Sequence, residues 1–444
     1  MTISSSAILL ILLIPIVAWS SSIVENLPGF SGALPFKLET GYVGVGENEL
    51  FYYFIESERD PVTDPLIIWI TGGPGCSALS GLVYEIGPMT FNGSSPVLKL
   101  NPYSWTKAAS IVFVDSPVGT GFSYSTTPQG YQTSDTQTAQ DNYSFLKKWL
   151  LSHPEFMTNP LFIAGDSYGG KMAILLALLV AQGIEAGVEP RLLLQGYLIG
   201  NTVTETAKDY NQRLPYAHRL GLLSDDYYAL AKRHCNGEYV NPDPGNMLCN
   251  NALHLFQMCL KDVDYAHILE PKCISSSGTV GGLIRLIPNQ NDEPECREGT
   301  YVSSAIWAND ETVRDSLHVR KGTISEWVRC NDSVSYAYDV QTVFHHYRVL
   351  IEKGYDGLLY SGDHDMVIPY LATLETVREL NLTLHEAWRP WRVNKQIAGY
   401  TQSYKHNGAY VVFATVKGGG HTAPEYRPRE CLEMMKRYTS KLPL

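Results

Sequence analysis

Residues 161–170, Leu-Phe-Ile-Ala-Gly-Asp-Ser-Tyr-Gly-Gly, constrain the fold more than any other stretch of the chain. The first four are apolar and indicate a short buried strand, and the next five follow the Gly-x-Ser-x-Gly pattern of a tight strand-to-helix turn. Gly165 and Gly169 suit such a turn because they carry no Cβ atom. The apolar run that follows favours a helix, so Ser167 is predicted at a helix N-terminus, where peptide dipoles favour developing negative charge. A glycine-rich turn with a serine that has no catalytic role would fit the same pattern. Whether Ser167 is a nucleophile therefore depends on whether the chain also supplies a base and an acid for it.

Other predicted strands also end in loops suited to catalysis. Residues 66–71 are a continuous apolar run that leads into the glycine-rich loop 72–77, where hydrolases place a backbone N–H group for an oxyanion. Two later runs lead to a pair of aspartates, Asp363 and Asp365, and to His421. Strands that alternate with helices in this way predict a mainly parallel sheet covered on both faces.

A serine hydroxyl needs a base to become a nucleophile, and the base needs a carboxylate to orient it. The chain order of Ser167, then an aspartate, then His421 is the order of the α/β-hydrolase fold. Asp363 and Asp365 follow the same strand, and the pattern does not choose between them. The predicted fold class is therefore α/β, an α/β-hydrolase core with helices flanking a mainly parallel central sheet.

The length of 444 residues fits one large core with an insertion. Between about 203 and 301 the strand and helix pattern changes, and five of the eight cysteines lie there. This segment is predicted to be an inserted, disulfide-bonded, mostly helical cap. The core is expected in two parts, 23–202 and 302–444.

Residues 1–22 are predicted to be a secretory signal peptide, because an apolar run over 7–19 is followed by small residues. No later segment has the apolar length of a membrane span, so no membrane contact is expected after cleavage. The cysteines suit an oxidising compartment, and the absence of metal-binding spacings predicts neither metal nor cofactor. The net charge of −11 argues against a nucleic-acid partner. Glycosylation is predicted at four Asn-x-Ser/Thr sequences, Asn92, Asn142, Asn331 and Asn381.

Four separated motifs together resemble the serine carboxypeptidase family. They are residues 69–77 (Trp-Ile-Thr-Gly-Gly-Pro-Gly-Cys-Ser), 165–170, 360–365 and 418–425. The resemblance implies that Asp365 is the triad acid and that the backbone N–H groups of Gly73 and Tyr168 form the oxyanion hole. It also implies three disulfides and two free cysteines, namely Cys76–Cys330, Cys235–Cys249 and Cys273–Cys296, with Cys259 and Cys431 free.

Peptidases of this family hold the terminal carboxylate of the substrate through an asparagine and two glutamates, and this chain departs from that pattern twice. Thr71 stands in place of the asparagine and Asp166 in place of one glutamate, while Glu85 is kept. A hydroxyl replaces an amide, and one carboxyl group is drawn back by about 1.5 Å. The network is therefore expected to hold a peptide C-terminus poorly. Gly72 completes the set of residues expected to contact the substrate.

The same two changes resemble the serine carboxypeptidase-like acyltransferases, a plant branch of the family that uses 1-O-β-glucose esters as acyl donors. The resemblance implies transfer of a hydroxycinnamoyl, galloyl or similar group to a hydroxyl acceptor in the secretory pathway, with the vacuole or else the extracellular space as the destination. A carboxypeptidase of altered specificity and a non-catalytic binding protein are the alternatives. Arg320 and Lys321 could meet an anionic acceptor, although a solvated basic surface explains them more simply.

Overall fold

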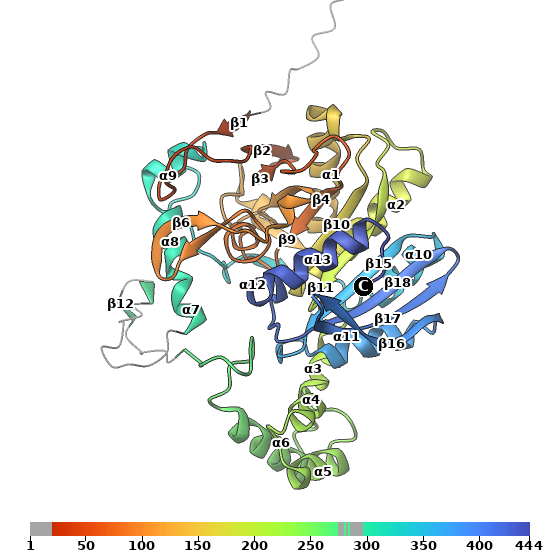
Figure 1. The fold of residues 1–444 in the computed structure, drawn as a ribbon. Coiled ribbons are helices and arrows are strands. Elements are labelled where there is room, and N and C mark those ends of the chain that lie inside the picture. The colour runs from red at the N-terminus through yellow and green to blue at the C-terminus, as the bar shows by residue number, and fades with distance from the viewer. Residues whose placement is uncertain (1–19, 274–278, 281–282, 285–295) are drawn as a thin grey trace, which may run out of the picture.

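The computed structural model describes residues 20–273, 279–280, 283–284 and 296–444 (Figure 1). A large sheet organises them, with 12 strands in the described part of the chain. Its path runs through β1 (Ser20–Val24), β2 (Leu38–Val45), β3 (Asn48–Ile55), β7 (Ser110–Val114), β4 (Leu66–Ile70), β10 (Leu161–Asp166), β11 (Leu194–Gly200), β15 (Asp356–Gly362), β18 (Ala409–Val416), β17 (Gln396–His406) and β16 (Thr383–Val393), and β8 (Tyr124–Ser125) pairs with β3. The central strands from β7 to β18 are parallel, and both flanks are antiparallel. The mainly parallel centre predicted from the sequence is confirmed.

Helices cover both faces of this sheet. One face packs against α1 (Asp135–Ser152), α2 (Ser167–Glu185), α10 (Phe344–Glu352) and α11 (Tyr370–Glu379). The other packs against α8 (Val302–Ala308), α9 (Glu311–Ser316), α12 (Ala423–Tyr426) and α13 (Pro428–Thr439). Alternate residues of β4 enter opposite clusters, Ile68 on the first face and Trp69 on the second. Because both faces are buried, the central strands are apolar without alternation.

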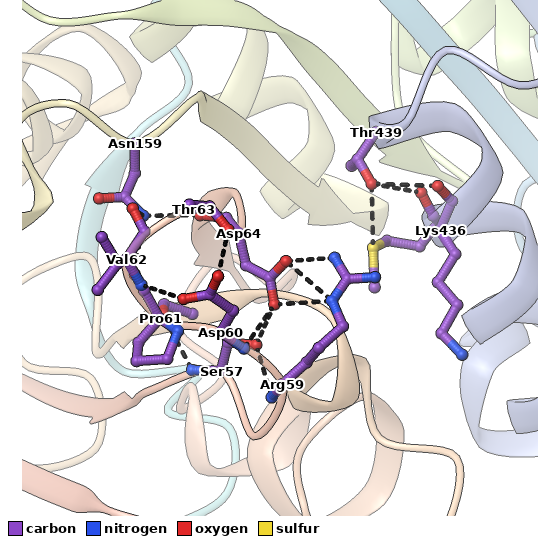
Figure 2. A network of polar contacts seen from close by, with 12 residues as sticks. Ser57, Arg59, Asp60, Pro61, Val62, Thr63, Asp64, Asn159, Lys436 and Thr439 are labelled. Carbon is purple, nitrogen blue, oxygen red and sulfur yellow. Dashed lines mark hydrogen bonds and ion pairs between the residues drawn. The ribbon is translucent and has the colours of Figure 1, made fainter.

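A polar network fixes β4 and β10 relative to each other at their amino ends (Figure 2). The Asp64 carboxylate pairs with Arg59, and the Asn159 side-chain amide donates to the backbone oxygen of Asp64 at 2.7 Å. In the resulting register Ile70 lies opposite Gly165. The two strands therefore end together, which brings the loop after β4 beside the turn after β10.

The inserted segment has a hydrophobic cluster of its own. Helices α4 (Arg213–Arg219), α5 (Asp225–His234) and α6 (Met247–Leu260) supply most of it, and Met366 and Leu371 of the core complete it. These helices lie together at one end of the molecule in Figure 1. The boundaries at 203 and 301 stay a prediction.

The remaining regular elements are short. They are β5 (Met89–Asn92), β6 (Ser95–Leu100), β9 (Gln132–Ser134), β12 (Thr279–Val280), β13 (Leu283–Ile284), β14 (Ser335–Ala337), α3 (Thr206–Asn211), α7 (Arg297–Thr300), a π-turn over Gly81–Glu85 and 3-10 turns over Trp105–Lys107, Gln129–Tyr131 and Pro154–Phe156.

The predicted signal peptide lies almost wholly outside the described residues. Its last three residues belong to β1, which pairs antiparallel with β2, so the predicted boundary after residue 22 falls inside a paired strand. In the described ranges one helix, α2, is long and apolar enough to cross a membrane, and it is mostly buried within the protein.

Candidate active site

The turn between β10 and α2 holds Ser167 in a strained backbone conformation. Its φ angle is 53°, in the left-handed region that residues other than glycine seldom adopt. A Cβ atom added to Gly165 or Gly169 would lie 2.6 or 2.2 Å from the carbonyl oxygen of Ile70. Both positions therefore require glycine, and the start of α2 lies directly against the end of β4.

Ser167, His421 and Asp365 form one hydrogen-bonded chain. The Ser167 hydroxyl donates to His421 Nε2 at 2.8 Å, and His421 Nδ1 donates to Asp365 Oδ2 at 2.9 Å. Asp365 follows β15 and is fully buried, whereas His421 follows β18. Because β15 and β18 are parallel neighbours, their carboxyl ends bring the acid and the base together. This is the arrangement in which a histidine can take the proton of a serine nucleophile.

Backbone and side-chain donors fix the Asp365 carboxylate. Its Oδ1 accepts from the Val367 N–H at 2.7 Å, and its Oδ2 accepts from Asn201 Nδ2 at 2.7 Å and from the Ile368 N–H at 3.2 Å. The sequence analysis did not single out Asn201 as a site residue. Its only signal in the sequence is the largely apolar run over 192–200 that precedes it, which forms β11, the neighbour of the strand that carries the acid.

The other candidate acid, Asp363, has a different role. Its Oδ1 accepts from the Gly418 N–H at 2.6 Å and so links the two loops that carry the triad acid and base. The structure therefore distinguishes the two aspartates, which the strand pattern left open.

Neighbouring charges shift the pKa of the His421 imidazole. Burial lowers the pKa of its imidazole, but the carboxylates of Asp365 and Asp166 outweigh burial, and the pKa is raised overall. A raised pKa makes the neutral imidazole a stronger base toward the Ser167 hydroxyl.

The loop after β4 lies against the nucleophile. A Cβ atom on Gly72 would be 2.7 Å from Ser167 Cβ, and Gly73 has a φ angle of 122° that only glycine adopts readily. Tyr168 is the second residue of α2, where helix geometry leaves the backbone N–H without an intrahelical acceptor. The disulfide Cys76–Cys330 anchors the far end of the loop. The two predicted oxyanion donors thus lie on segments that meet at Ser167.

A buried polar cluster around the Tyr168 side chain was not predicted from the sequence. Asp135, the first residue of α1, accepts from the hydroxyls of Tyr168 at 2.5 Å and Tyr336 at 2.9 Å, and it forms an ion pair with Lys171 at 3.5 Å. Asp135 and Lys171 are almost completely buried. Since Tyr168 and Lys171 both lie in the first two turns of α2, this cluster fixes the helix end beside the nucleophile.

Two buried carboxyl groups, Glu85 and Asp166, lie side by side next to the triad. Burial and the neighbouring Asp166 charge raise the pKa of Glu85 well above its usual range, and Glu85 hydrogen-bonds to Asp166. Burial raises the pKa of Asp166 to about 6, although His421 and the Glu85 hydrogen bond oppose the rise. Both carboxyl groups therefore resist ionisation, and Glu85 is the donor of the hydrogen bond between them.

Thr71 occupies the third position of the predicted substrate-binding set. Its side-chain oxygen accepts from the Trp69 indole N–H at 3.1 Å, and both side chains are buried. The residues predicted to contact the substrate, Thr71, Gly72, Glu85 and Asp166, lie on the elements around Ser167. Their contact with a substrate stays a prediction.

Asp166→Asn is expected to move the acidic limb of Ser167 reactivity to lower pH. The Asp166 carboxylate raises the pKa of His421, which must be neutral to act as a base, so its removal lets His421 stay neutral in more acidic solution. The rate at which a fluorophosphonate labels Ser167, measured from about pH 4 to 8, checks this shift. A profile that superimposes on that of the wild type would contradict it.

The three disulfides that the resemblance implies are present, Cys76–Cys330, Cys235–Cys249 and Cys273–Cys296. Cys259 and Cys431 are free thiols. Arg320 contacts Glu49 and the Tyr124 hydroxyl, and Lys321 pairs with Asp315. The simpler interpretation of these two cations, a basic surface, agrees with these contacts.

The predicted glycosylation positions differ in exposure. Asn92 and Asn381 are exposed, and their glycans stay a prediction. Asn142 is only 2% exposed on the inner side of α1, so a glycan there does not fit the folded protein. Asn331 is half-buried, and its Nδ2, the atom that a glycan would modify, donates to the Gly119 carbonyl at 2.9 Å. Within the described residues, no group of three or more His, Cys, Asp or Glu side chains could hold a metal ion.

Comparison with known proteins extends over almost the whole chain. Residues 28–441 match the serine carboxypeptidase family. Serine carboxypeptidase-like 7 of Arabidopsis thaliana is 46% identical over 433 residues, which cover 96% of this chain and 94% of the relative. Serine carboxypeptidase-like 13 of the same plant is 44% identical over 454 aligned residues and covers 100% of both chains.

A solved structure shares the fold. KEX1(delta)p, a prohormone-processing carboxypeptidase from Saccharomyces cerevisiae, aligns with a TM-score of 0.75 at 20% identity, over 91% of this chain and 92% of that chain. The predicted α/β-hydrolase fold is confirmed by this likeness together with the mainly parallel sheet. With the family match and the two plant relatives, these findings place the chain in the serine carboxypeptidase family.

Proposed function

We propose that the protein is an acyltransferase, which moves a hydroxycinnamoyl, galloyl or similar group from a 1-O-β-glucose ester to a hydroxyl acceptor through an acyl ester on Ser167. One observation carries the proposal: beside an intact triad, Thr71 and Asp166 replace the asparagine and glutamate with which peptidases of the family hold a terminal carboxylate. The proposed partners are these two small molecules, and neither nucleic acid nor a membrane takes part.

The two buried carboxyl groups of the site, Glu85 and Asp166, fit a substrate that carries hydroxyl groups. Glucose hydroxyls are uncharged and can both donate and accept. Glu85 Oε2 and Asp166 Oδ1 are buried and form no hydrogen bond within the described protein, so the pair has unused hydrogen-bonding capacity beside the triad.

In the proposed reaction, Ser167 Oγ attacks the ester carbonyl while His421 Nε2 takes its proton. The backbone N–H groups of Gly73 and Tyr168 stabilise the oxyanion of the tetrahedral intermediate. The intermediate collapses and the bond between the acyl carbon and the anomeric oxygen breaks. His421 returns the proton to that oxygen, so glucose leaves. An acceptor hydroxyl then attacks the acyl ester, His421 takes the hydroxyl proton and delivers it to Ser167, and the enzyme is regenerated. Transfer exceeds hydrolysis when the bound acceptor excludes water from the acyl ester.

Trapping of the acyl-enzyme tests this proposal. The protein is mixed with a hydroxycinnamoyl or galloyl glucose ester at mildly acidic pH, quenched in acid and mapped by peptide mass spectrometry. We expect an acyl group on the peptide that contains Ser167, a faster loss of this group when malate or another hydroxyl acceptor is present, and no adduct in Ser167→Ala. No adduct and no release of glucose would overturn the proposal.

A carboxypeptidase of altered specificity is the second candidate, because Glu85 is kept and still hydrogen-bonds to the residue before the nucleophile. The double variant Thr71→Asn and Asp166→Glu is expected to raise carboxypeptidase activity on a blocked dipeptide about 10-fold or more. It restores an amide donor and extends one carboxyl group, and a hydrogen bond to a charged group contributes about 1.5–3 kcal/mol.

The release of the C-terminal amino acid measures this gain. The single variant Thr71→Ser is the matched control, since it keeps the hydroxyl at this position and is expected to leave the activity unchanged. A double variant no more active on the dipeptide than the wild type would contradict the assigned role of these two positions.

A non-catalytic binding protein is separated from both enzymes by labelling. A fluorophosphonate reacts with a serine only when the serine is activated, so an unreactive Ser167 would favour a binding role. For the proposed acyltransferase, the three disulfides agree with passage through the secretory pathway. The vacuole is the proposed destination, since its acidity would keep the pair of Glu85 and Asp166 protonated.

A further inference from the structure

One peptide group connects the triad acid to an arginine of the inserted segment. The carbonyl oxygen of Val367 accepts from Arg213 Nε at 3.0 Å and from Arg213 Nη2 at 2.8 Å. The N–H of the same peptide group belongs to Ile368 and donates to Asp365 Oδ2 at 3.2 Å. That carboxylate oxygen also accepts from His421 Nδ1. Arg213 therefore reaches the catalytic base through one peptide group and one carboxylate.

The Arg213 guanidinium is held in a defined place. It lies over the Tyr210 ring at 3.8 Å from the ring centre and near the Tyr265 ring at 5.7 Å. A planar guanidinium that stacks on an aromatic ring and donates two hydrogen bonds to one oxygen has little freedom left. Its position therefore fixes the position of the Val367 carbonyl.

The backbone around Tyr265 holds both triad loops. The Tyr265 carbonyl accepts from the N–H groups of Met366 at 2.8 Å and Val367 at 3.1 Å. The next carbonyl, that of Ala266, accepts from the backbone N–H of His421 at 2.8 Å. The loop that carries the acid and the loop that carries the base are thus both bonded to one segment of the insertion, which Arg213 contacts from α4.

The charge of Arg213 also acts on the triad. No carboxylate of the described residues lies within 4.0 Å of its guanidinium, so its charge is not neutralised by a close ion pair. Three charged groups act on His421 besides burial: Asp365 and Asp166 raise the pKa of the imidazole, whereas Arg213 lowers it. Tyr210, Tyr265 and Asp365 are the titratable groups that act on Arg213 itself.

We propose that Arg213 is a positioning residue of the triad, which orients Asp365 through the Val367–Ile368 peptide group and offsets part of the negative charge around His421. The inserted segment then completes the catalytic geometry in addition to covering the core. The inference rests on the triad of the proposed function, but it holds for hydroxyl and water acceptors alike.

The pH profile of Ser167 labelling by a fluorophosphonate tests this role without reference to the natural substrate. Arg213→Lys keeps the charge and loses the two-pronged hydrogen bond, so we expect the plateau rate to fall about 10-fold with the midpoint of the acidic limb unchanged. Arg213→Met loses both the charge and the hydrogen bonds. The plateau of the labelling rate should therefore fall, and the midpoint of its acidic limb should move to higher pH, because a positive charge that lowers the pKa of His421 is gone.

Arg320→Met is the matched control. Arg320 also lies over a tyrosine ring, at 4.5 Å from the centre of Tyr42, and its guanidinium contacts Glu49 and the Tyr124 hydroxyl, which lie outside the triad. We expect its labelling profile to match that of the wild type, with any loss of stability visible only in thermal unfolding.

Two results would overturn the inference: a wild-type plateau in Arg213→Lys, or a wild-type midpoint in Arg213→Met. If Arg213→Met does not fold, the plateau of Arg213→Lys decides alone. Failure of the proposed function has a different signature. If the glucose ester forms no acyl-enzyme on Ser167, the acyltransferase is overturned, whereas the labelling profiles of the Arg213 variants are unaffected.

Discussion

Asp365→Asn is expected to lower the turnover of an activated ester about 10⁴-fold, as the loss of the orienting carboxylate does in other serine triads. Asp365 is fully buried, and its Oδ2 accepts from His421 Nδ1 at 2.9 Å. An asparagine fills the same space, but its amide cannot stabilise the imidazolium, and its NH₂ group can select the wrong histidine tautomer. The kcat for hydrolysis of a p-nitrophenyl ester measures the loss, and an unchanged melting temperature shows that the fold survives.

Asp363→Asn is the matched control, since the two aspartates lie two residues apart in one loop. Asp363 accepts from the Gly418 N–H and makes no hydrogen bond to His421 among those of the described residues. An asparagine oxygen can accept from the same N–H group, so kcat is expected to fall less than about 10-fold. Equal losses in the two variants, or a larger loss in Asp363→Asn, would contradict the assignment of Asp365 as the triad acid.

Gly72→Ala is expected to lower kcat about 10²-fold or more while the protein still folds. The added Cβ would lie 2.7 Å from Ser167 Cβ and 3.1 Å from Ser167 Oγ, so the nucleophile or the loop has to move. A displacement of about 1 Å at a reacting atom costs about this factor. The rate of acyl-enzyme formation measures it directly, because the change acts on the attacking atom.

Gly44→Ala controls for the general cost of adding a methyl group to a glycine. The atoms nearest to its Cβ would be those at the flexible end of the Glu49 side chain, at 3.2 Å, and Gly44 lies in β2 on the antiparallel flank of the sheet. We expect the acylation rate of this variant to match that of the wild type. A Gly72→Ala variant as active as Gly44→Ala would show that the loop after β4 does not lie against the nucleophile.

The central strands and the triad could be predicted because their signals are local or ordered along the chain. All of β4 and the first four residues of β10 are apolar, since both faces of these strands are buried, and the tight turn at Ser167 requires its two glycines. The choice of Asp365 over Asp363 needed more than the strand pattern. The motif resemblance implied it, and the hydrogen bond to His421 now gives its physical reason.

The positioning contacts could not be predicted, because they join residues far apart in the sequence. Asp135 meets Tyr168 and Tyr336 across 33 and 201 positions of the chain, and Arg213 meets Val367 across 154. No spacing or motif marks such pairs. They arise only when the sheet brings the ends of its strands and the inserted segment to the same edge.

The sequence analysis did not predict the hairpin of β16 and β17, for another reason. The hairpin of β16 and β17 lies at the sheet edge, most residues of β16 are exposed, and Pro390 interrupts the pattern of β16. Such a strand lacks the continuous apolar run of a central strand. Asn142 shows the opposite error: its three-residue sequence suggested a glycan, but the position faces inward from α1.

A competition in one reaction tests the proposed acyl transfer most directly. The protein is incubated at mildly acidic pH with an aromatic acyl glucose ester, a hydroxyl acceptor such as malate, and a blocked dipeptide. We expect glucose and the acylated acceptor to appear, both to vanish in Ser167→Ala, and the dipeptide to stay intact. Release of the C-terminal amino acid without acyl transfer would contradict the account, because it would mean that Thr71 and Asp166 still hold a peptide carboxylate.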